Sequence, residues 1–402
     1  MKYQHEINEL MRLMQDDAVA DSEGLTWLIS HTSEERGSNV IGPDLYSGMA
    51  GMAWVFGEFG KLMGRKDAAR ISFQCICHAL DNADKVPVEH RLGFYNGWTG
   101  LIYVATYLHK LYESPELLAK ARNLLFRLMS SEPSAEFDLM AGTAGAVAGL
   151  SLVSPVLGEP AIEYALKLAG TLRNTSSTWR KTGTIVWTQP NRQLPLTGFS
   201  HGNAGVGWAL MELWSVAKED WIIEMAVKAF DYENLYYDPE NKNWFDLRNY
   251  VSARALNKLP PKGEVAWCHG AGGIALSRMR AYELLNDISY LNEAIAGADT
   301  LLQNVLSTIN SDALPSCICQ GLVGNLFMLE ILKKRLAPFK HYDIPEIANK
   351  SLDDFLSHLD SERVEPGLML GMPGLGLHLM FLNDQKILTP VLPQAIENGL
   401  QE

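Results

Sequence analysis

Residues 198–210 read GFSHGNAGVGWAL, and two glycines three positions apart, Gly202 and Gly205, open the apolar run in this stretch. The same spacing occurs seven times along the chain. The other six pairs are Gly48/Gly51, Gly97/Gly100, Gly142/Gly145, Gly270/Gly273, Gly321/Gly324 and Gly371/Gly374. Successive first glycines are separated by 49, 45, 60, 68, 51 and 50 residues. A repeat at this period indicates a stacked or closed array of similar supersecondary units.

Each glycine pair precedes a mostly apolar run, such as VGWALMELW after Gly205. Apolar residues lie on nearly all faces of these runs, which predicts helices buried on more than one side. Segments with a charged face and an apolar stripe lie between them, at residues 67–83, 115–129, 160–172, 221–232, 288–305 and 344–359. We therefore expect a single all-α domain, residues 1–402, in which the repeats over residues 44–382 form two concentric helical rings with the glycines at one end.

The charge balance narrows the classes of function. The 402 residues include 34 basic and 47 acidic ones, for a formal net charge of −13, and 47% are hydrophobic. An acidic chain without a basic cluster argues against nucleic-acid binding. The N-terminus, MKYQHEINEL, lacks the apolar core of a signal peptide. The uncharged stretch from Leu139 to Gly158 contains Pro155 and coincides with the third repeat, so we expect a buried helix there and no membrane span.

Cysteine usage points to metal chemistry. Five cysteines in a chain of this length are no disulfide framework, which predicts a reducing, cytoplasmic setting. Cys268 and Cys319 each stand two residues before the first glycine of their repeat, so both thiols should reach the same end of the barrel. Convergent thiolates favour zinc among common metals. The alternative is a pair of buried, inert cysteines.

The remaining cysteines have plainer interpretations. The tract Cys75-Ile76-Cys77-His78 falls on an expected outer helix, where neighbouring side chains point in different directions, so we expect core packing. Cys317, two residues before Cys319, is either a spare ligand or part of the core.

Two histidines and an aspartate occupy related repeat positions. His201 and His269 each stand one residue before the first glycine of their repeat, which predicts that both face the same end as the cysteines. We interpret both as functional, the alternative being satisfied polar residues at helix starts. Asp138 stands four residues before the glycine of repeat three, as Asp44 does in repeat one. An aspartate there could be functional or could simply cap a helix.

Two connections are longer than the others. Residues 175–195 indicate a loop with a short hairpin, and residues 236–265 form a long aromatic segment containing proline. Long loops in compact domains are often functional, and these two adjoin the repeats that carry His201 and Cys268. They are either a substrate-facing rim or surface decoration.

Several of these segments together resemble a known family. GFSHGNAGVGWAL, WCHGAGGIALSR at 267–278 and CICQGLVGN at 317–325 resemble the three signature segments of the lanthionine synthetase C-like cyclases. They are most similar to the cyclase portion of the class II lanthipeptide synthetases. DLYSGMAG at 44–51, NWFDLR at 243–248 and LMLGMPGLGLHL at 368–379 support the resemblance, which covers nearly the whole chain.

The resemblance implies an α/α toroid of two seven-helix layers with zinc at one end. The family's metal ligands correspond to Cys268, Cys319 and the position of Gln320, where the family usually has histidine. A carboxamide is a weak zinc ligand. Three outcomes stay open: Cys317 or a nearby histidine completes the site, zinc binds with two thiolates, water and the amide, or the site has lost its metal.

The implied activity is the formation of thioether rings, a C–S bond-forming reaction. A zinc-bound cysteine thiolate of a dehydrated precursor peptide adds to dehydroalanine or dehydrobutyrine in the same peptide. His201 then supplies a proton, Asp138 orients it, and His269 orients water or substrate. A dehydratase, fused or separate, is an expected partner, and its region in class II synthetases has no counterpart in this sequence, so we expect an excised or a free-standing cyclase.

Three alternatives to this activity are a metal-depleted module that binds peptides or thiols without turnover, a relative that adds glutathione to dehydrated residues, and an α/α-barrel glycosidase. The glycosidase would need paired carboxylates at the barrel mouth, and the repeats offer only Asp44 and Asp138 at matching positions.

Overall fold

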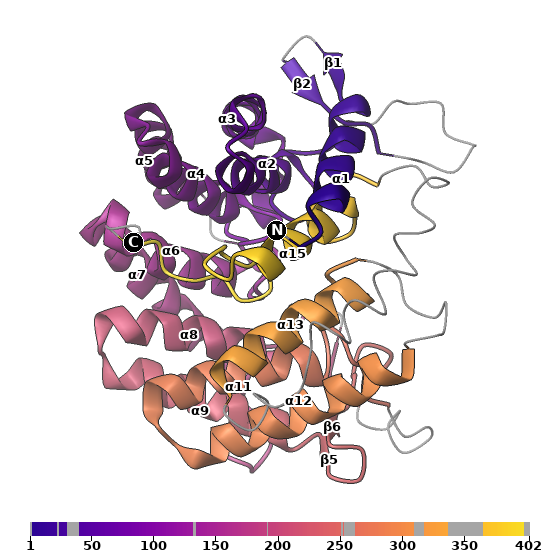
Figure 1. The fold of residues 1–402 in the computed structure, drawn as a ribbon. Coiled ribbons are helices and arrows are strands. Elements are labelled where there is room, and N and C mark those ends of the chain that lie inside the picture. Colours follow the sequence, from indigo (N-terminus) through magenta and orange to yellow (C-terminus); the bar gives the residue numbers. More distant parts are fainter. Residues whose placement is uncertain are drawn as a thin grey trace.

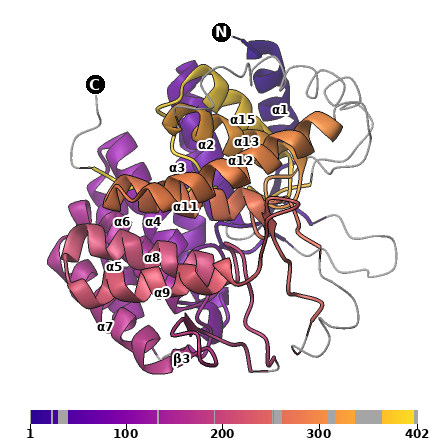
Figure 2. The same ribbon diagram turned by 90° about the horizontal axis from the view of Figure 1, so that it is seen from below.

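The architecture is almost entirely helical in the computed structural model. The structure describes residues 2–21, 24–29, 40–131, 134–190, 192–250, 252, 262–308, 317–336 and 365–397. Figure 1 shows the helices arranged around a common centre, and Figure 2 shows the same arrangement from below.

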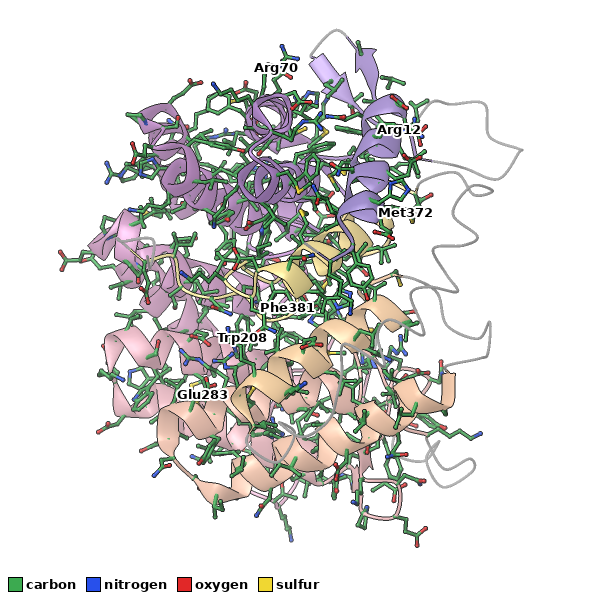
Figure 3. All side chains as sticks on the ribbon, in the orientation of Figure 1. Arg12, Arg70, Trp208, Glu283, Met372 and Phe381 are labelled. Atoms are coloured by element: carbon green, nitrogen blue, oxygen red, sulfur yellow. The ribbon has the colours of Figure 1, made fainter. Side chains whose placement is uncertain are left out.

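The seven glycine-led runs form a closed inner ring, as predicted. They are α2 (Met49–Met63), α4 (Trp98–Tyr112), α6 (Thr143–Leu157), α8 (Asn203–Ala217), α11 (Ala271–Leu285), α13 (Leu322–Arg335) and α15 (Met372–Asn383). Each of these helices contacts the next one along the chain, and α15 contacts α2, which closes the ring. Figure 3 shows Trp208 and Phe381 among these helices, and both side chains are buried.

An outer layer of amphipathic helices covers the inner ring. Five of them pack on the inner helix that precedes them in the chain, namely α3 (Lys66–Asp81), α5 (Pro115–Met129), α7 (Glu159–Thr175), α9 (Asp220–Asn234) and α12 (Ile288–Thr308). Arg70 on α3 points outwards in Figure 3. The segment expected at residues 344–359 lies outside the described residues.

The N-terminal helix α1 (Gln4–Asp16) covers α15 and was not among the predicted elements. Its buried side chains, Ile7, Leu10, Met11 and Met14, follow the i, i+3, i+4, i+7 spacing of an amphipathic helix. The outer layer thus includes residues from the N-terminal end of the chain, which a search limited to residues between the glycine pairs misses.

The glycine pairs are explained by close backbone packing. The first glycine of each pair is the N-cap residue of its inner helix. A Cβ atom on the second glycine of repeat four, Gly205, would lie 2.0 Å from the Phe199 carbonyl oxygen and 2.8 Å from a methyl carbon of Leu139. Glycine is required because no larger residue fits between these neighbours.

The loops that precede the inner helices hydrogen-bond to one another, which brings the helix N-termini to one end of the barrel. In most cases a backbone N–H of one repeat donates to a carbonyl of a neighbouring repeat. The bonds run from Leu45 to Tyr95, Phe94 to Leu139, Leu139 to Ser200, Phe199 to Cys268, Cys319 to Met369 and Met369 to Tyr46, with N···O distances of 2.9–3.2 Å. This belt of loops carries the site residues predicted from the sequence: Asp138, His201, Cys268, His269, Cys319 and Gln320.

The C-terminal segment after α15 packs against the inner ring, and Figure 1 shows it crossing the middle of the ring towards α6. The Tyr95 hydroxyl donates to the Pro390 carbonyl at 2.7 Å, and the Trp267 indole N–H donates to the Val391 carbonyl at 2.9 Å. Both donors belong to the belt of loops. The segment therefore supports the belt from inside the molecule.

Three two-stranded antiparallel sheets complete the described structure: β1–β2 (Val19–Asp21, Gly24–Thr26), β3–β4 (Ser177–Thr178, Ile185–Val186) and β5–β6 (Tyr237–Asp238, Asn243–Trp244). Two short 3₁₀ helices, η1 (Ala83–Lys85) and η2 (Val88–His90), follow α3. β3–β4 is the hairpin expected within residues 175–195. No helix in the described part of the chain combines the length and apolarity that a bilayer span needs.

Candidate functional site

An aspartate–histidine pair forms one side of the site, which we call the imidazole side (Asp138 and His201). His201 Nδ1 lies 2.6 Å from Asp138 Oδ2. The side chain of Asp138 is 4% exposed and that of His201 is 38% exposed, so solvent or substrate reaches the imidazole but not the carboxylate. Burial lowers the pKa of His201, but the hydrogen bond to Asp138 and its charge outweigh burial and raise it above its usual value. A buried partner thus holds the imidazole and favours its protonated form.

Asp138 also accepts a backbone N–H within its own loop, whereas the N-cap residue of α6 is Gly142, which has no side-chain cap. Asp138 Oδ1 accepts the backbone N–H of Ala141 at 2.9 Å. Asp44, at the same offset in repeat one, accepts the backbone N–H of Ser47 at 2.8 Å in the same way. This backbone contact is therefore common to the two repeats, whereas the contact with His201 is made by Asp138 of repeat three.

His269 lies beside His201 but has the opposite electrostatic character. The two rings are stacked, with centroids 6.0 Å apart and planes inclined by 27°. His269 is 1% exposed. Burial and the positive charge of Arg248 lower its pKa to about 3, so the ring is neutral at physiological pH. Its Nδ1 lies 3.3 Å from the Thr197 carbonyl oxygen. A carbonyl oxygen only accepts hydrogen bonds, so the neutral ring carries its proton on Nδ1 and its Nε2 is an acceptor.

The loop that carries His201 is shaped by Gly198 and by a buried glutamate. Gly198 has φ +108°, and a Cβ there would lie 2.8 Å from His269 Nδ1. Glu233 of α9 is fully buried and accepts the backbone N–H groups of Gly198 at 3.2 Å and Ala204 at 2.6 Å. Burial raises the pKa of Glu233 to about 8. These contacts fix both ends of the segment on which His201 sits.

Two adjoining thiols and a carboxamide form the other side, which we call the sulfur side (Cys268, Cys319 and Gln320). Cys268 and Cys319 adjoin each other, and both cysteines are 4% exposed. The neighbouring Cys319 side chain lowers the pKa of Cys268 against the effect of burial, with a further contribution from the charge of Arg248. Gln320 is exposed, and its side-chain amide is near enough to Cys268 to contribute to the lowered pKa of that thiol. The two thiols thus converge as the repeat positions predict.

The sulfur side contains two thiols, a type of side chain that binds metals strongly as thiolate. Within the described residues, no three His, Cys, Asp or Glu side chains are arranged to hold a metal together. Cys317 is buried and lies within electrostatic range of Cys319, but it does not complete such a set. The donor set is two thiols with a carboxamide beside them. This set suits a soft metal such as zinc and leaves coordination positions for water or a substrate.

Arg248 and Asp246 are site residues that the sequence interpretation did not single out. Asp246 is 8% exposed, and its Oδ2 accepts Arg248 Nε at 2.9 Å and Nη2 at 2.7 Å. The Arg248 guanidinium lies close enough to Cys268, His201 and His269 to influence the pKa of each. The sequence signal that could have identified them is the NWFDLR segment in the long connection after α9, because Asp246 and Arg248 form a charged pair at i, i+2 within it.

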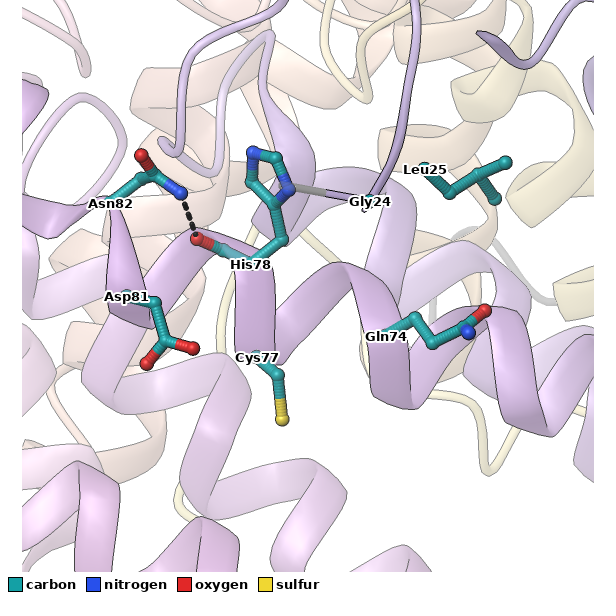
Figure 4. Close-up of a pocket in the computed structure, with 7 residues that line it drawn as sticks. All are labelled: Gly24, Leu25, Gln74, Cys77, His78, Asp81 and Asn82. Carbon is teal, nitrogen blue, oxygen red and sulfur yellow. Dashed lines mark hydrogen bonds between the residues drawn. The ribbon is translucent and has the colours of Figure 1, made fainter. Parts of the chain in front are cut away.

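The tract around Cys77 lies elsewhere. Cys75 and Ile76 are fully buried on α3, as expected. Cys77 and His78 line a cavity of about 450 Å³ between α3 and β2, together with Gly24, Leu25, Gln74, Asp81 and Asn82 (Figure 4). None of these residues belongs to the belt of loops, so this cavity is separate from the candidate site.

The chain matches a family model and resembles a curated protein in sequence. A family model described as lanthionine synthetase C-like protein matches residues 39–395. The lacticin 481/lactococcin biosynthesis protein LcnDR2 of Lactococcus lactis subsp. lactis is 21% identical over 399 residues, covering 92% of this chain. The chain spans 39% of the length of that curated relative.

Two solved structures share the fold. Nisin cyclase superposes with a TM-score of 0.67 at 16% identity, over 96% of this chain and 95% of that one. A GH76 α-mannanase from Bacteroides thetaiotaomicron superposes with a TM-score of 0.50 at 14% identity, over 95% of each chain. At these identities the likeness concerns the α/α toroid, which hosts different chemistries, so the activity must be argued from the side chains.

Proposed function

Because the chain belongs to the lanthionine synthetase C-like family, we propose that it is a cyclase that forms lanthionine or methyllanthionine rings in a dehydrated precursor peptide. The observation that carries the proposal is the Asp138–His201 pair beside two adjoining thiols at one end of the toroid. A thiol-activating side next to a charged imidazole suits the addition of a thiol to a dehydrated residue.

The proposed zinc site is formed by the residues of the sulfur side. Cys268 and Cys319 would hold zinc as thiolates, with Gln320 as a weak third protein ligand. Zinc, when bound, supplies a Lewis acid that lowers the pKa of a substrate thiol and so provides thiolate near neutral pH. Arg248 adds positive charge beside Cys268, which favours the thiolate form of that ligand.

His201 is proposed as the proton donor. When a peptide thiolate adds to the β-carbon of dehydroalanine, a C–S bond forms and the electron pair of the Cα=Cβ bond moves towards the carbonyl oxygen. The resulting enolate takes a proton at the α-carbon. The raised pKa of His201 favours the protonated imidazole that donates this proton. The substrate thiol has released one proton to solvent, and the imidazole regains one from solvent, so the protons balance.

His269 is proposed to orient the substrate. Its lowered pKa excludes it as a proton donor at neutral pH. Because Nδ1–H is directed at the Thr197 carbonyl, Nε2 can accept a hydrogen bond from a peptide N–H or a water. The two stacked histidines thus have different proposed roles: His201 donates a proton, and the neutral His269 accepts a hydrogen bond.

Gln320 favours a second candidate, a module that binds dehydrated peptides or thiols without turnover because the metal is lost. The glycosidase alternative has no matching support, because Asp138 is paired with His201 and Asp246 with Arg248, whereas that chemistry needs two carboxyl groups that flank the glycosidic bond.

The test uses a synthetic peptide that carries one cysteine and one dehydroalanine. Ring closure leaves the mass unchanged, so the remaining thiol is trapped with N-ethylmaleimide and the products are read by mass spectrometry. Near-stoichiometric zinc and loss of the alkylated product support the cyclase. Peptide binding without zinc or thiol loss supports the binding module, and a glutathione adduct formed in the presence of glutathione supports the glutathione-adding alternative.

A further inference from the structure

A buried loop lies inside the inner ring of helices. Residues 389–393, TPVLP, follow α15 and are buried throughout, although they form neither helix nor strand. Figure 1 shows the segment after α15 crossing the middle of the ring. Loops normally lie at the surface, because buried backbone N–H and C=O groups need hydrogen-bond partners. Residues 389–393, which we call the C-terminal plug, must therefore obtain these partners from the surrounding helices and loops.

Aromatic side chains of the belt of loops supply the partners. The Tyr95 hydroxyl donates to the Pro390 carbonyl at 2.7 Å. The Trp267 indole N–H donates to the Val391 carbonyl at 2.9 Å. Pro390 and Pro393 have no N–H group, so the plug has two fewer buried donors to satisfy. Hydrogen bonds that begin on the belt of loops thus hold the plug in place.

Trp267 connects the plug to both sides of the candidate site. It immediately precedes Cys268 in the chain, and its indole packs edge-on against the phenyl ring of Phe199, with centroids 5.9 Å apart. Phe199 lies two residues before His201, and its backbone N–H donates to the Cys268 carbonyl at 3.0 Å. The Tyr95 ring packs against the same indole, with centroids 4.9 Å apart. The indole therefore contacts both the plug and the loop that carries the imidazole.

We propose that Trp267 is a positioning residue, whose hydrogen bond to the plug fixes the loop of Cys268 relative to the loop of His201. Its consequence for ring formation rests on the proposed function. In that reaction the C–S bond forms at the β-carbon of the dehydrated residue and the proton is delivered to the neighbouring α-carbon. The groups that supply thiolate and proton must therefore keep a fixed separation, and a misplacement of about 1 Å can lower a rate by about 10²-fold.

The chain supplies a matched control in Trp208 of α8 (Figure 3). Like Trp267, it is fully buried and packs its indole against Phe199, with centroids 5.3 Å apart. Its indole N–H has no hydrogen-bond partner among the described residues. Trp208→Phe and Trp267→Phe therefore remove the same atoms from one aromatic cluster, but only Trp267→Phe leaves the Val391 carbonyl without its donor.

The first measurement compares ring closure by the full-length chain and the two variants, with the synthetic peptide and added zinc. We expect Trp267→Phe to lower kcat by about 10²-fold. KM should stay unchanged, because the exposed side chains that meet the peptide are the same. Trp208→Phe should keep both constants. Both variants lose similar packing, so their thermal unfolding midpoints should fall by similar amounts, which separates positioning from general destabilisation.

The second measurement needs no turnover. In the full-length chains treated with a zinc chelator, a short pulse of N-ethylmaleimide labels each cysteine at a rate that mass spectrometry reads peptide by peptide. One buried hydrogen bond contributes a factor of up to about ten to a local opening equilibrium. Cys268 should therefore be labelled up to about tenfold faster in Trp267→Phe than in Trp208→Phe. Cys75, buried on α3, is the internal reference and should be labelled equally in both.

A second pair of variants tests the plug with the loss of single atoms. Tyr95→Phe removes the hydrogen bond to Pro390 and keeps the indole of Trp267. Its control is Tyr103→Phe, because the Tyr103 hydroxyl donates to the Gln394 carbonyl at 2.9 Å, just after the plug. Should Trp267→Phe fail to fold, the same two measurements apply to this pair, with faster labelling of Cys268 expected in Tyr95→Phe alone.

The outcomes separate this inference from the proposed function. Faster labelling of Cys268 in Trp267→Phe alone supports the positioning role, and an unmodified chain that closes no ring overturns the proposed function without deciding that role. Equal labelling of Cys268 in the two tryptophan variants overturns the role, as does an unchanged kcat in Trp267→Phe. Equal increases at Cys268 and Cys75 also overturn it, since they indicate general loosening of the core.

Discussion

The imidazole side and the sulfur side of the site differ in how many of the side chains that the proposed chemistry needs are present. On the imidazole side, Asp138 is buried, bonded to its own loop and 2.6 Å from His201. On the sulfur side, two thiols converge, but the third position is an exposed glutamine. The proposed proton-donating half therefore depends only on residues already in place, whereas Gln320, in the proposed metal-binding half, is where this chain departs from the pattern expected from the sequence resemblance.

The two sides are nevertheless joined by hydrogen bonds between their loops. The Cys268 carbonyl accepts the N–H groups of Phe199 and Ser200 at 3.0 and 3.1 Å, and the Ser200 hydroxyl at 3.2 Å. His201 follows directly in the chain, so the position of the imidazole relative to the sulfur is set by backbone hydrogen bonds. Substitutions that remove a side chain without disturbing this link can test each side separately.

The largest expected effect comes from removing a thiol. Cys268→Ala leaves one thiolate and a carboxamide, so we expect zinc affinity to fall by more than the roughly 100-fold that loss of an outer-shell partner can cause. Ring formation should fall to the uncatalysed rate. Zinc content after dialysis and the N-ethylmaleimide assay measure the two effects. Cys75→Ala, at a buried thiol on α3, is the control that should keep its zinc. Retention of zinc by Cys268→Ala would contradict this assignment.

Removing the imidazole should affect catalysis alone. We expect His201→Asn to lower the rate of ring closure by about 10²–10⁴-fold, the usual contribution of a positioned proton donor. Zinc affinity should remain unchanged because His201 holds no metal in this scheme. The rate is measured in single-turnover reactions with the dehydrated peptide, and zinc affinity by chelator competition. An unchanged rate would remove His201 from the mechanism, and loss of zinc would place it on the sulfur side.

Asp138→Asn should change the pH dependence. The proton-donating form of His201 is lost as pH rises through its pKa, and the Asp138 hydrogen bond and charge keep that pKa raised. In the variant burial dominates and lowers the pKa, so the falling limb of the rate profile should move to lower pH. At pH values above the His201 pKa of both proteins, the variant should be slower by about tenfold for each unit by which its His201 pKa is lowered. Well below both pKa values the two rates should be similar. A profile displaced in the opposite direction would contradict the pairing.

The repeat offsets made most of this arrangement predictable. Because one loop precedes each inner helix, residues at equal offsets such as His201 and His269 must face the same end, and the glycine spacing alone gives the inner ring. The orientation of each side chain at that end of the barrel was not predictable. Tyr46 and Tyr95 share an offset, yet the Tyr95 side chain is fully buried and donates to the C-terminal segment, whereas Tyr46 is only partly buried, because packing decides which way each ring turns. Arg248 was missed because its long connection has no repeat to align it.

The smallest expected effect is a gain on the sulfur side. His201 and His269 already occupy the offset of Gln320, so the loop geometry accepts an imidazole there, and the exposure of Gln320 leaves room for one. Imidazole is a stronger zinc ligand than a carboxamide, so Gln320→His should raise zinc affinity about tenfold, within the range of single changes around metal sites. The ring-closure rate at saturating zinc should change little, since His201 and Asp138 are untouched. Gln320→Asn, which keeps the carboxamide, is the control for chelator competition. Equal zinc affinity in all three proteins would mean that position 320 does not face the metal, and that the departure from the family's pattern has no consequence for binding.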